Sequence, residues 1–186
     1  MSTPYEAVTN YFHAKDGNRP YLMRRAWAAD ATLDMVVHTD AIAFPAKNVG
    51  LAAIENTVGR RFADDFENVY TFGLSLPEEK HRRHFPCHWL VGMSGKRNGP
   101  IRVGCGRYDW HFTEDARCLI ARATFTIEAM VEMPATEIEC IMGWVTALPY
   151  PWCTPVDALK SMPTDAALAD VRRFLERAGP MEPERR

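Results

Sequence analysis

The sequence predicts an α+β domain, in which helices cover one face of a curved sheet of antiparallel or mixed strands. Apolar residues follow a helical spacing in the first third of the chain, alternate with polar residues from Val69 to about Ala147, and return to helical spacing after Pro149 and Pro151. The length of 186 residues suits a single domain. We therefore expect one domain over residues 1–150, a helical extension of it over 151–179 and a tail over 180–186.

The N-terminal region is expected to form three helices, with one strand between the second and the third. Apolar residues recur three and four positions apart in each expected helix, whereas apolar and polar residues alternate in the strand. Asn18 can cap the second helix, and Pro20 suits its first turn. The expected elements are helices over residues 4–15, 18–30 and 51–62 and a strand over residues 31–38.

The middle of the chain is expected to form further strands, joined by turns. The turn from Ser94 to Gly99 predicts a hairpin, and in the long strand that ends at Met133 the odd-numbered residues from Leu119 to Val131 share one apolar face. Thr154-Pro155 and Thr164 then predict the starts of two terminal helices. The expected strands cover residues 70–76, 85–93, 101–112, 119–133 and 138–147.

Composition and charge argue against several classes of partner. The 22 basic and 24 acidic residues are mixed along the chain, so no basic field exists that would hold nucleic acid or an anionic bilayer. No apolar run approaches the ~20 residues needed to span a membrane, and the first residues do not resemble a signal peptide. The five cysteines are widely separated and include no C-x-x-C pair, which is typical of buried thiols in a reduced cytoplasm.

Short motifs follow one another along roughly residues 1–147 in a recognisable order. They are Tyr11-Phe12 with Asp16-Gly17-Asn18, Trp27-Ala28-Ala29-Asp30-Ala31-Thr32, Val49-Gly50-Leu51-Ala52-Ala53-Ile54, Arg83-His84-Phe85, Gly106-Arg107-Tyr108 and Phe112-Thr113-Glu114-Asp115. This order resembles the nuclear transport factor 2-like superfamily, specifically its SnoaL-like branch. The resemblance implies a cone-shaped sheet with the N-terminal helices on its concave face, a largely apolar pocket and a homodimer. It does not imply one reaction, because the superfamily includes isomerases, dehydratases, cyclases, epoxide hydrolases and pure binding modules.

The resemblance also implies candidate catalytic residues. Similarity to ketosteroid isomerase gives Tyr11 and Tyr108 the role of oxyanion donors, but places Met35 where the carboxylate base should lie, while Asp34 points to the other strand face. Similarity to scytalone dehydratase implies that His84 is the base. The implied enzyme is a cofactor-independent lyase or isomerase, in which the two tyrosines donate hydrogen bonds to a developing enolate.

Strand alternation leaves the position of His84 open. In the run from His84 to Met93 the odd-numbered residues are apolar, which sends His84 and His88 to the outer face, although Pro86 permits a bulge that would reverse this. The spacing of His81, His84 and His88 does not favour a metal site, because residues four apart in a strand lie ~13 Å apart. We therefore expect no metal.

Bulky apolar side chains are expected to line the pocket, as in most small-molecule sites. The predicted ligand-binding residues are Trp27, Met35, Trp89, Trp110, Phe125 and Trp144. The polar row Arg107, Asp109 and His111 is expected to pair with Arg122 and Glu128 on the adjacent strand, facing solvent or a second subunit. The sequence thus predicts a protein that binds a small hydrophobic or polycyclic molecule, either as a lyase or isomerase or as a non-catalytic binding or dimerisation module.

Overall fold

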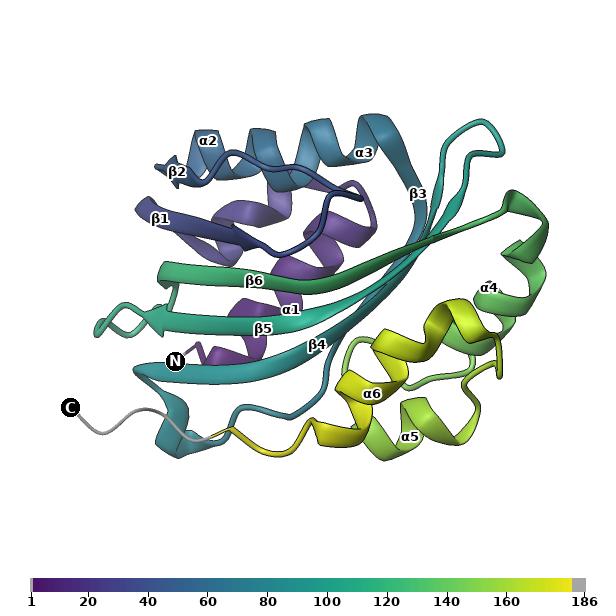
Figure 1. The fold of residues 1–186 in the computed structure, drawn as a ribbon. Helices are drawn as coiled ribbons and strands as arrows, with labels where there is room; N and C mark the ends of the chain where they lie inside the picture. The colour runs from purple at the N-terminus through teal and green to yellow at the C-terminus, as the bar shows by residue number, and fades with distance from the viewer. Residues whose placement is uncertain (1, 182–186) are drawn as a thin grey trace.

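The computed structural model describes residues 2–181, and its centre is a curved, six-stranded mixed sheet (Figure 1). The strand order is β2-β1-β6-β5-β4-β3, and the neighbours β1 and β6 are parallel whereas the other neighbours are antiparallel. The strands are β1 (Trp27–Val37), β2 (Lys47–Val49), β3 (Phe66–Gly73), β4 (His84–Gly95), β5 (Ile101–Phe112) and β6 (Ile120–Met133). The predicted α+β class with a mixed sheet is confirmed.

Helices cover both faces of the sheet (Figure 1). The inner face packs on helix α1 (Pro4–Asp16) and on one continuous helical stretch, made of α2 (Leu51–Ile54), a π-helical segment (Glu55–Arg61) and α3 (Phe62–Asp65). The outer face is partly covered by three C-terminal helices. They are α4 (Ile138–Thr146), α5 (Pro155–Lys160) and α6 (Ala169–Arg177).

Local sequence explains where α1 begins. The Thr3 side chain accepts a hydrogen bond from the Glu6 amide at 3.2 Å, and the Glu6 carboxylate accepts one from the Thr3 amide at 2.9 Å. This reciprocal capping satisfies amides that have no partner within the helix, and Pro4 fits the first helical position, where no amide hydrogen is needed. The cap therefore fixes where α1 begins, and the helix buries Val8, Tyr11 and Phe12 against the sheet.

Each face of the sheet has a hydrophobic core of its own. The inner core contains the fully buried side chains of Phe12, Trp27 and Trp110. The outer core, under the C-terminal helices, contains Phe72 and Leu90. The sheet thus separates two interiors, and a strand residue reaches one or the other according to its alternation.

A β-bulge at Glu128 divides β6 into two halves. On the neighbouring strand, Gly106 pairs with Ile127 and Cys105 pairs with Ala129, which leaves Glu128 as the extra residue. Ile127 accordingly belongs to the inner core, and Ala129 packs on the outer core. A second extra residue, Ala121, lies opposite the step from His111 to Phe112, and it places the even-numbered Ile120 in the inner core. The prediction that odd-numbered residues 119–131 all share one face therefore holds only from Ala123 to Ile127, because each extra residue reverses the alternation.

Two expected elements differ from the structure, and one strand was not expected. Residues 138–147 form helix α4 instead of a strand, and their buried positions Ile141, Trp144 and Val145 show the helical spacing that a short apolar run can hide. The expected second helix is a 3-10 turn over Pro20–Arg25, after which β1 begins earlier than predicted. The short strand β2 was not predicted.

The other expected helices and strands are confirmed, with ends shifted by a few residues. Most of the expected tail over residues 180–186 lies outside the described residues. No helix among residues 2–181 has both the length and the apolar character needed to cross a membrane.

Candidate functional site

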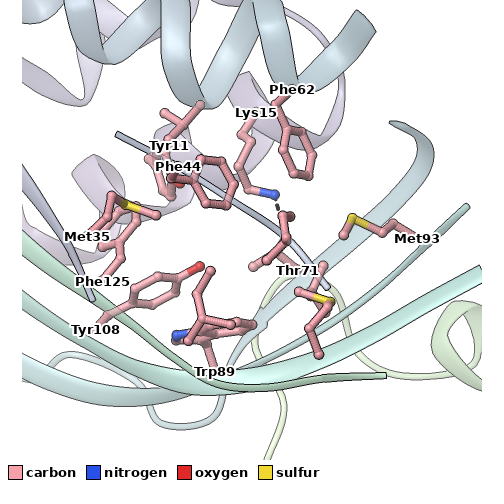
Figure 2. A pocket seen from close by; sticks show the side chains of 15 residues that line it. Tyr11, Lys15, Met35, Phe44, Phe62, Thr71, Trp89, Met93, Tyr108 and Phe125 are labelled. Carbon is pink, nitrogen blue, oxygen red and sulfur yellow. Dashed lines mark hydrogen bonds between the residues drawn. The ribbon is translucent and has the colours of Figure 1, made fainter. Parts of the chain in front are cut away.

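A small cavity lies between α1, the continuous helical stretch from α2 to α3 and the inner face of the sheet (Figure 2). Its volume is about 50 Å³. Most of its wall is apolar, with side chains such as Met35, Phe44, Phe62, Trp89 and Phe125. Among the described residues, hydroxyl and amino groups enter the wall from Tyr11, Lys15, Thr71 and Tyr108. The cavity is thus an apolar space with a few polar groups, which is the usual form of a small-molecule site.

The two tyrosines approach the cavity from opposite sides, Tyr11 from α1 and Tyr108 from β5 (Figure 2). Both rings contact Phe125, with centroid distances of 5.5 Å for Tyr11 and 4.5 Å for Tyr108. Within the part of the chain that the structure describes, neither hydroxyl forms a hydrogen bond. Burial raises the pKa of both tyrosines well above the usual value. Both therefore stay protonated and can donate a hydrogen bond to an oxygen placed between them.

Lys15 brings a positive charge to the edge of the cavity. Its ammonium donates to the Asp16 carboxylate at 2.6 Å and to the Thr71 hydroxyl at 2.8 Å, and lies 4.7 Å from the centre of the Phe62 ring. The side chains of Lys15 and Asp16 are only 8% and 3% exposed. A charge this deeply buried needs such partners, because unpaired burial costs several kcal/mol.

Asp16 is the centre of this polar cluster. Besides the Lys15 ammonium, its carboxylate accepts hydrogen bonds from the Thr71 amide at 2.7 Å, the Thr71 hydroxyl at 2.9 Å and the Tyr150 hydroxyl at 3.1 Å. These bonds join the end of α1 to β3 and to the segment that follows α4. The cluster therefore holds α1, and with it Tyr11, in a fixed position above the sheet.

Sequence reasoning did not single out Lys15 as a site residue. A signal was present, because Lys15 follows Tyr11 by four positions and so lies on the same face of α1. A lysine at the end of an amphipathic helix is usually a solvated residue, which is why the signal is weak.

The predicted ligand-binding residues lie in three places. Met35, Trp89 and Phe125 line the cavity. Trp27 and Trp110 belong to the inner core and pack against Tyr11, with ring centroids 5.7 and 5.4 Å away. Trp144 lies on α4 in the outer core, where its indole nitrogen donates to the Ala158 carbonyl at 3.0 Å. Residues 138–147 form a helix on the outer face instead of a strand, so the sheet lies between Trp144 and the cavity.

His84 lies on the outer face of the sheet, opposite the cavity. The pairing of β4 with β5 runs without a break from His84 to Ser94, so Pro86 introduces no bulge and the alternation holds. The His84 imidazole contacts the Asp109 carboxylate and stacks on the His111 ring, with centroids 4.3 Å apart and planes 6° apart. Burial lowers the pKa of His111. The base that the resemblance to scytalone dehydratase implies is therefore not among the side chains of the cavity wall.

The rest of the polar row forms the ladder that cross-strand pairing predicts. The Arg107 guanidinium lies 2.8 Å from the Glu128 carboxylate, and Arg122 donates to the His111 imidazole at 3.2 Å. Glu128 also contacts His38, the residue that follows β1, at 3.0 Å. The outer face beyond the C-terminal helices is thus a polar surface built on four neighbouring strands.

The chemistry of the cavity follows from this distribution. The described side chains that line it include phenols, one ammonium group and one aliphatic hydroxyl, but no carboxylate or imidazole. Such a wall can orient and polarise a ligand oxygen. It offers no ready proton acceptor while Lys15 is charged.

Comparisons with known proteins show the fold alone. No family model matches the chain, and no curated protein matches it. Among solved structures, a nuclear transport factor 2-like protein from Salmonella enterica is 14% identical, with a TM-score of 0.52 over 67% of this chain and 88% of that chain. A protein from Catenulispora acidiphila with a ketosteroid isomerase-like fold, solved with trimethylamine, is 20% identical, with a TM-score of 0.51 over 67% of this chain and 85% of that chain.

A third similar structure is an enzyme. The hexachlorocyclohexane dehydrochlorinase LinA type 2 is 10% identical, with a TM-score of 0.53 over 69% of this chain and 84% of that chain. Isomerase-like proteins and a lyase thus share the architecture, with little sequence in common. The order of helices and strands, the mixed curved sheet and these similar structures agree that this chain has the nuclear transport factor 2-like fold.

Proposed function

We propose that this protein binds a small, mainly apolar molecule that carries one hydrogen-bond-accepting oxygen. The observation that carries the proposal is the pair of hydroxyls on Tyr11 and Tyr108, which face an apolar cavity without a hydrogen-bond partner among residues 2–181. A hydrogen bond to each hydroxyl is worth roughly 0.5–1.5 kcal/mol. A ligand oxygen between the two hydroxyls would gain that free energy, and the apolar wall would hold the rest of the molecule.

The size of the cavity favours a compact ligand over a polycyclic one. The volume of about 50 Å³ is only a few times the ~10–15 Å³ that a single water needs. Met35, Met93 and Met130 line the cavity and have the flexible side chains that can widen such a space. A single ring with one carbonyl group is therefore the ligand class that we place first.

Proton-transfer catalysis of the isomerase or lyase type is the second candidate, and the position of Lys15 favours it. In an enolisation, Tyr11 and Tyr108 would donate hydrogen bonds to the oxyanion, and a base would remove the proton next to the carbonyl. Lys15 would become that base only after passing its proton to Asp16, 2.6 Å away. Since the wall holds no carboxylate or imidazole among its described residues, we place binding before catalysis.

Binding is tested with a pair of molecules of the same shape, cyclohexanone and methylenecyclohexane. Trp89 stacks on Tyr108 with centroids 5.4 Å apart, so its fluorescence reports on the cavity. We expect the ketone to bind more tightly than the alkene by roughly tenfold, the worth of one to two hydrogen bonds. Tyr108→Phe and Tyr11→Phe should reduce this preference, and Trp144→Phe, on the other side of the sheet, should not. Equal affinity for both molecules in the wild type would refute the proposal.

Catalysis is tested by following the exchange of the α-hydrogens of cyclohexanone in D₂O by proton NMR. If the protein only binds the ketone, exchange proceeds at the rate in buffer. An accelerated exchange that Lys15→Met abolishes, while Trp144→Phe preserves it, would establish the second candidate. The homodimer and the cytoplasmic location stay predictions.

A further inference from the structure

His84, Asp109 and His111 form a compact group on the outer face, away from the cavity. His84 and His111 are direct cross-strand partners on β4 and β5, and Asp109 lies two residues before His111 on the same face of its strand. One ligand atom from each of the three residues lies within 4.8 Å of the ligand atoms of the other two. Residues two positions apart on a strand point to the same face, and a residue paired with one of them on the neighbouring strand points there too. This arrangement directs the three side chains to one point.

The two imidazoles present the same nitrogen to the carboxylate. Nε2 of His84 contacts one carboxylate oxygen of Asp109, and Nε2 of His111 lies 3.5 Å from the other oxygen. The parallel stacking of the rings holds both in this orientation. Their side chains are 22% and 27% exposed, and that of Asp109 is 45% exposed, so the group is partly shielded but open to solvent on one side.

We infer that His84, Asp109 and His111 bind one divalent transition metal ion of the zinc type. Two imidazole nitrogens and one carboxylate are a common ligand set for such ions, with bond lengths of about 2.0–2.2 Å. Ligand atoms around one tetrahedral ion are then roughly 3.4 Å apart, within the 4.8 Å that now bounds the separations of the three ligand atoms. Binding requires the two stacked rings to tilt toward one another, because an imidazole nitrogen binds a metal ion in the plane of its ring. The open side leaves the fourth position to water.

Arg122 is the feature that sets the strength of this site. Its guanidinium donates to Nε2 of His111 at 3.2 Å, so it occupies the lone pair that a metal ion would use and adds a positive charge nearby. Arg122 must move aside on binding, which its long side chain allows because His111 and Arg122 lie at the edge of the exposed polar ladder. We therefore expect moderate affinity in the natural sequence, and tighter binding when the guanidinium is removed.

The site differs from the one rejected on sequence grounds. His81, His84 and His88 lie along one chain segment, whereas the present group joins two strands and uses only His84 from that set. Pairing of β4 with β5 thus brings together residues that are 25 and 27 positions apart in the chain. The inference does not depend on the proposed ligand of the inner cavity, because the sheet lies between the two sites.

The test is calorimetric titration of untagged, full-length protein with ZnCl₂, followed by the visible absorption of the Co²⁺ form. The background carries Cys140→Ser, because Cys140 is an exposed thiol that could bind zinc by itself. We expect one ion per chain, with a Kd below about 100 µM. His84→Gln, His111→Gln and Asp109→Asn should each weaken binding by at least about tenfold and change the Co²⁺ spectrum. Arg122→Gln should tighten binding roughly fivefold, as expected from removing a nearby positive charge.

His88→Gln is the matched control, since His88 lies on the same strand and the same face as His84 but outside the group. It should leave the Kd unchanged. The inference is refuted if no one-to-one zinc binding occurs below 100 µM, or if binding persists in the three ligand variants. Loss of binding in His88→Gln or His38→Gln alone would refute it as well, because the ion would then sit elsewhere on the outer face. Circular dichroism of each variant verifies that the fold is retained.

Discussion

The Lys15 ammonium donates a 2.8 Å hydrogen bond to the Thr71 hydroxyl, although the two residues lie 56 positions apart in the sequence. Asp16 accepts hydrogen bonds from both side chains, and all three residues are nearly inaccessible to solvent. This contact fixes the end of α1 against β3 at the edge of the cavity. It connects the stability of the fold to the position of the phenol on Tyr11, one helical turn earlier.

Asp16→Asn is expected to destabilise the protein strongly. The substitution leaves the Lys15 ammonium buried without its counter-charge, which should lower the free energy of unfolding by about 3–5 kcal/mol. Tyr150→Phe removes only one of the hydrogen bonds to the same carboxylate, and should cost about 1 kcal/mol. Urea unfolding at neutral pH measures both. If Asp16→Asn costs less than Tyr150→Phe, the ion pair of Lys15 with Asp16 is not important for stability.

Tyr11→Phe and Tyr108→Phe are expected to leave stability unchanged or slightly higher. Neither hydroxyl has a protein partner in the described structure, so its removal loses no hydrogen bond and relieves about 1 kcal/mol of desolvation at most. Trp144→Phe should instead cost roughly 1–3 kcal/mol, because it leaves the buried Ala158 carbonyl without its donor. Thermal unfolding of the three variants side by side provides the comparison. A large loss in either tyrosine variant would mean that its hydroxyl has a partner within the protein.

Stability is expected to fall as the pH rises above about 9. Burial raises the pKa of the thiols of Cys87, Cys105 and Cys153 from an ordinary value of 9.0 to about 12. Between these values the unfolded chain loses the thiol protons and the folded chain retains them, so each thiol favours unfolding by about 1.4 kcal/mol per pH unit. The contribution is fully present below pH 9 and is lost as the pH rises.

Urea unfolding under reducing conditions at pH 8 and at pH 10 measures this effect. Cys105→Ala should show a smaller drop between the two pH values than the wild type, since one of the titrating groups is gone. An identical drop in both proteins would exclude Cys105 as a cause.

Replacing glycine by alanine is expected to have opposite effects on stability at two positions, Gly106 and Gly143. A Cβ atom at Gly106 would lie 1.9 Å from the Thr126 carbonyl oxygen, a backbone atom of the paired strand that cannot easily move away. Gly106→Ala should therefore cost more than about 2 kcal/mol and disturb the pairing of β5 with β6. A Cβ atom at Gly143, on the exposed side of α4, meets nothing within 4 Å. Gly143→Ala should stabilise the protein by about 0.5–1 kcal/mol, and chemical unfolding of both variants checks the contrast.

Alternation and helical spacing predicted most of this fold because they report which face of an element is buried. They placed Tyr108 on the apolar face of its strand, and they sent His84 to the outer face, against the role that the resemblance implied for it. The strand alternation and the family resemblance disagreed about His84, and the alternation was right because the pairing of β4 with β5 has no irregularity there. The resemblance supplied what local patterns lack, namely how the helices and strands are arranged around Tyr11.

The features that the sequence did not reveal depend on tertiary context. Helix α4 is too short for its apolar run to be told from a strand, and its buried positions become evident only against the outer core. β6 itself contains no glycine or proline at the bulge, and Gly106, which lies opposite it, belongs to β5, so the sequence of β6 alone does not show that its faces exchange. Lys15 is a site residue only because Asp16 and Thr71 surround its charge, and that grouping arises from the packing of α1 on β3.

The bulge at Glu128 has a consequence for how this strand tolerates change. Deleting Glu128 would remove the bulge and leave Ala129 opposite Cys105, with the later residues on their present faces. Inserting one residue after Ala129 would instead put every later residue of the strand out of phase with β5. Met130 would then turn toward the C-terminal helices and Val131 toward α1, so the two interiors would exchange their occupants. In the second half of β6, the number of residues therefore decides which interior a side chain enters, and it matters as much as their identity.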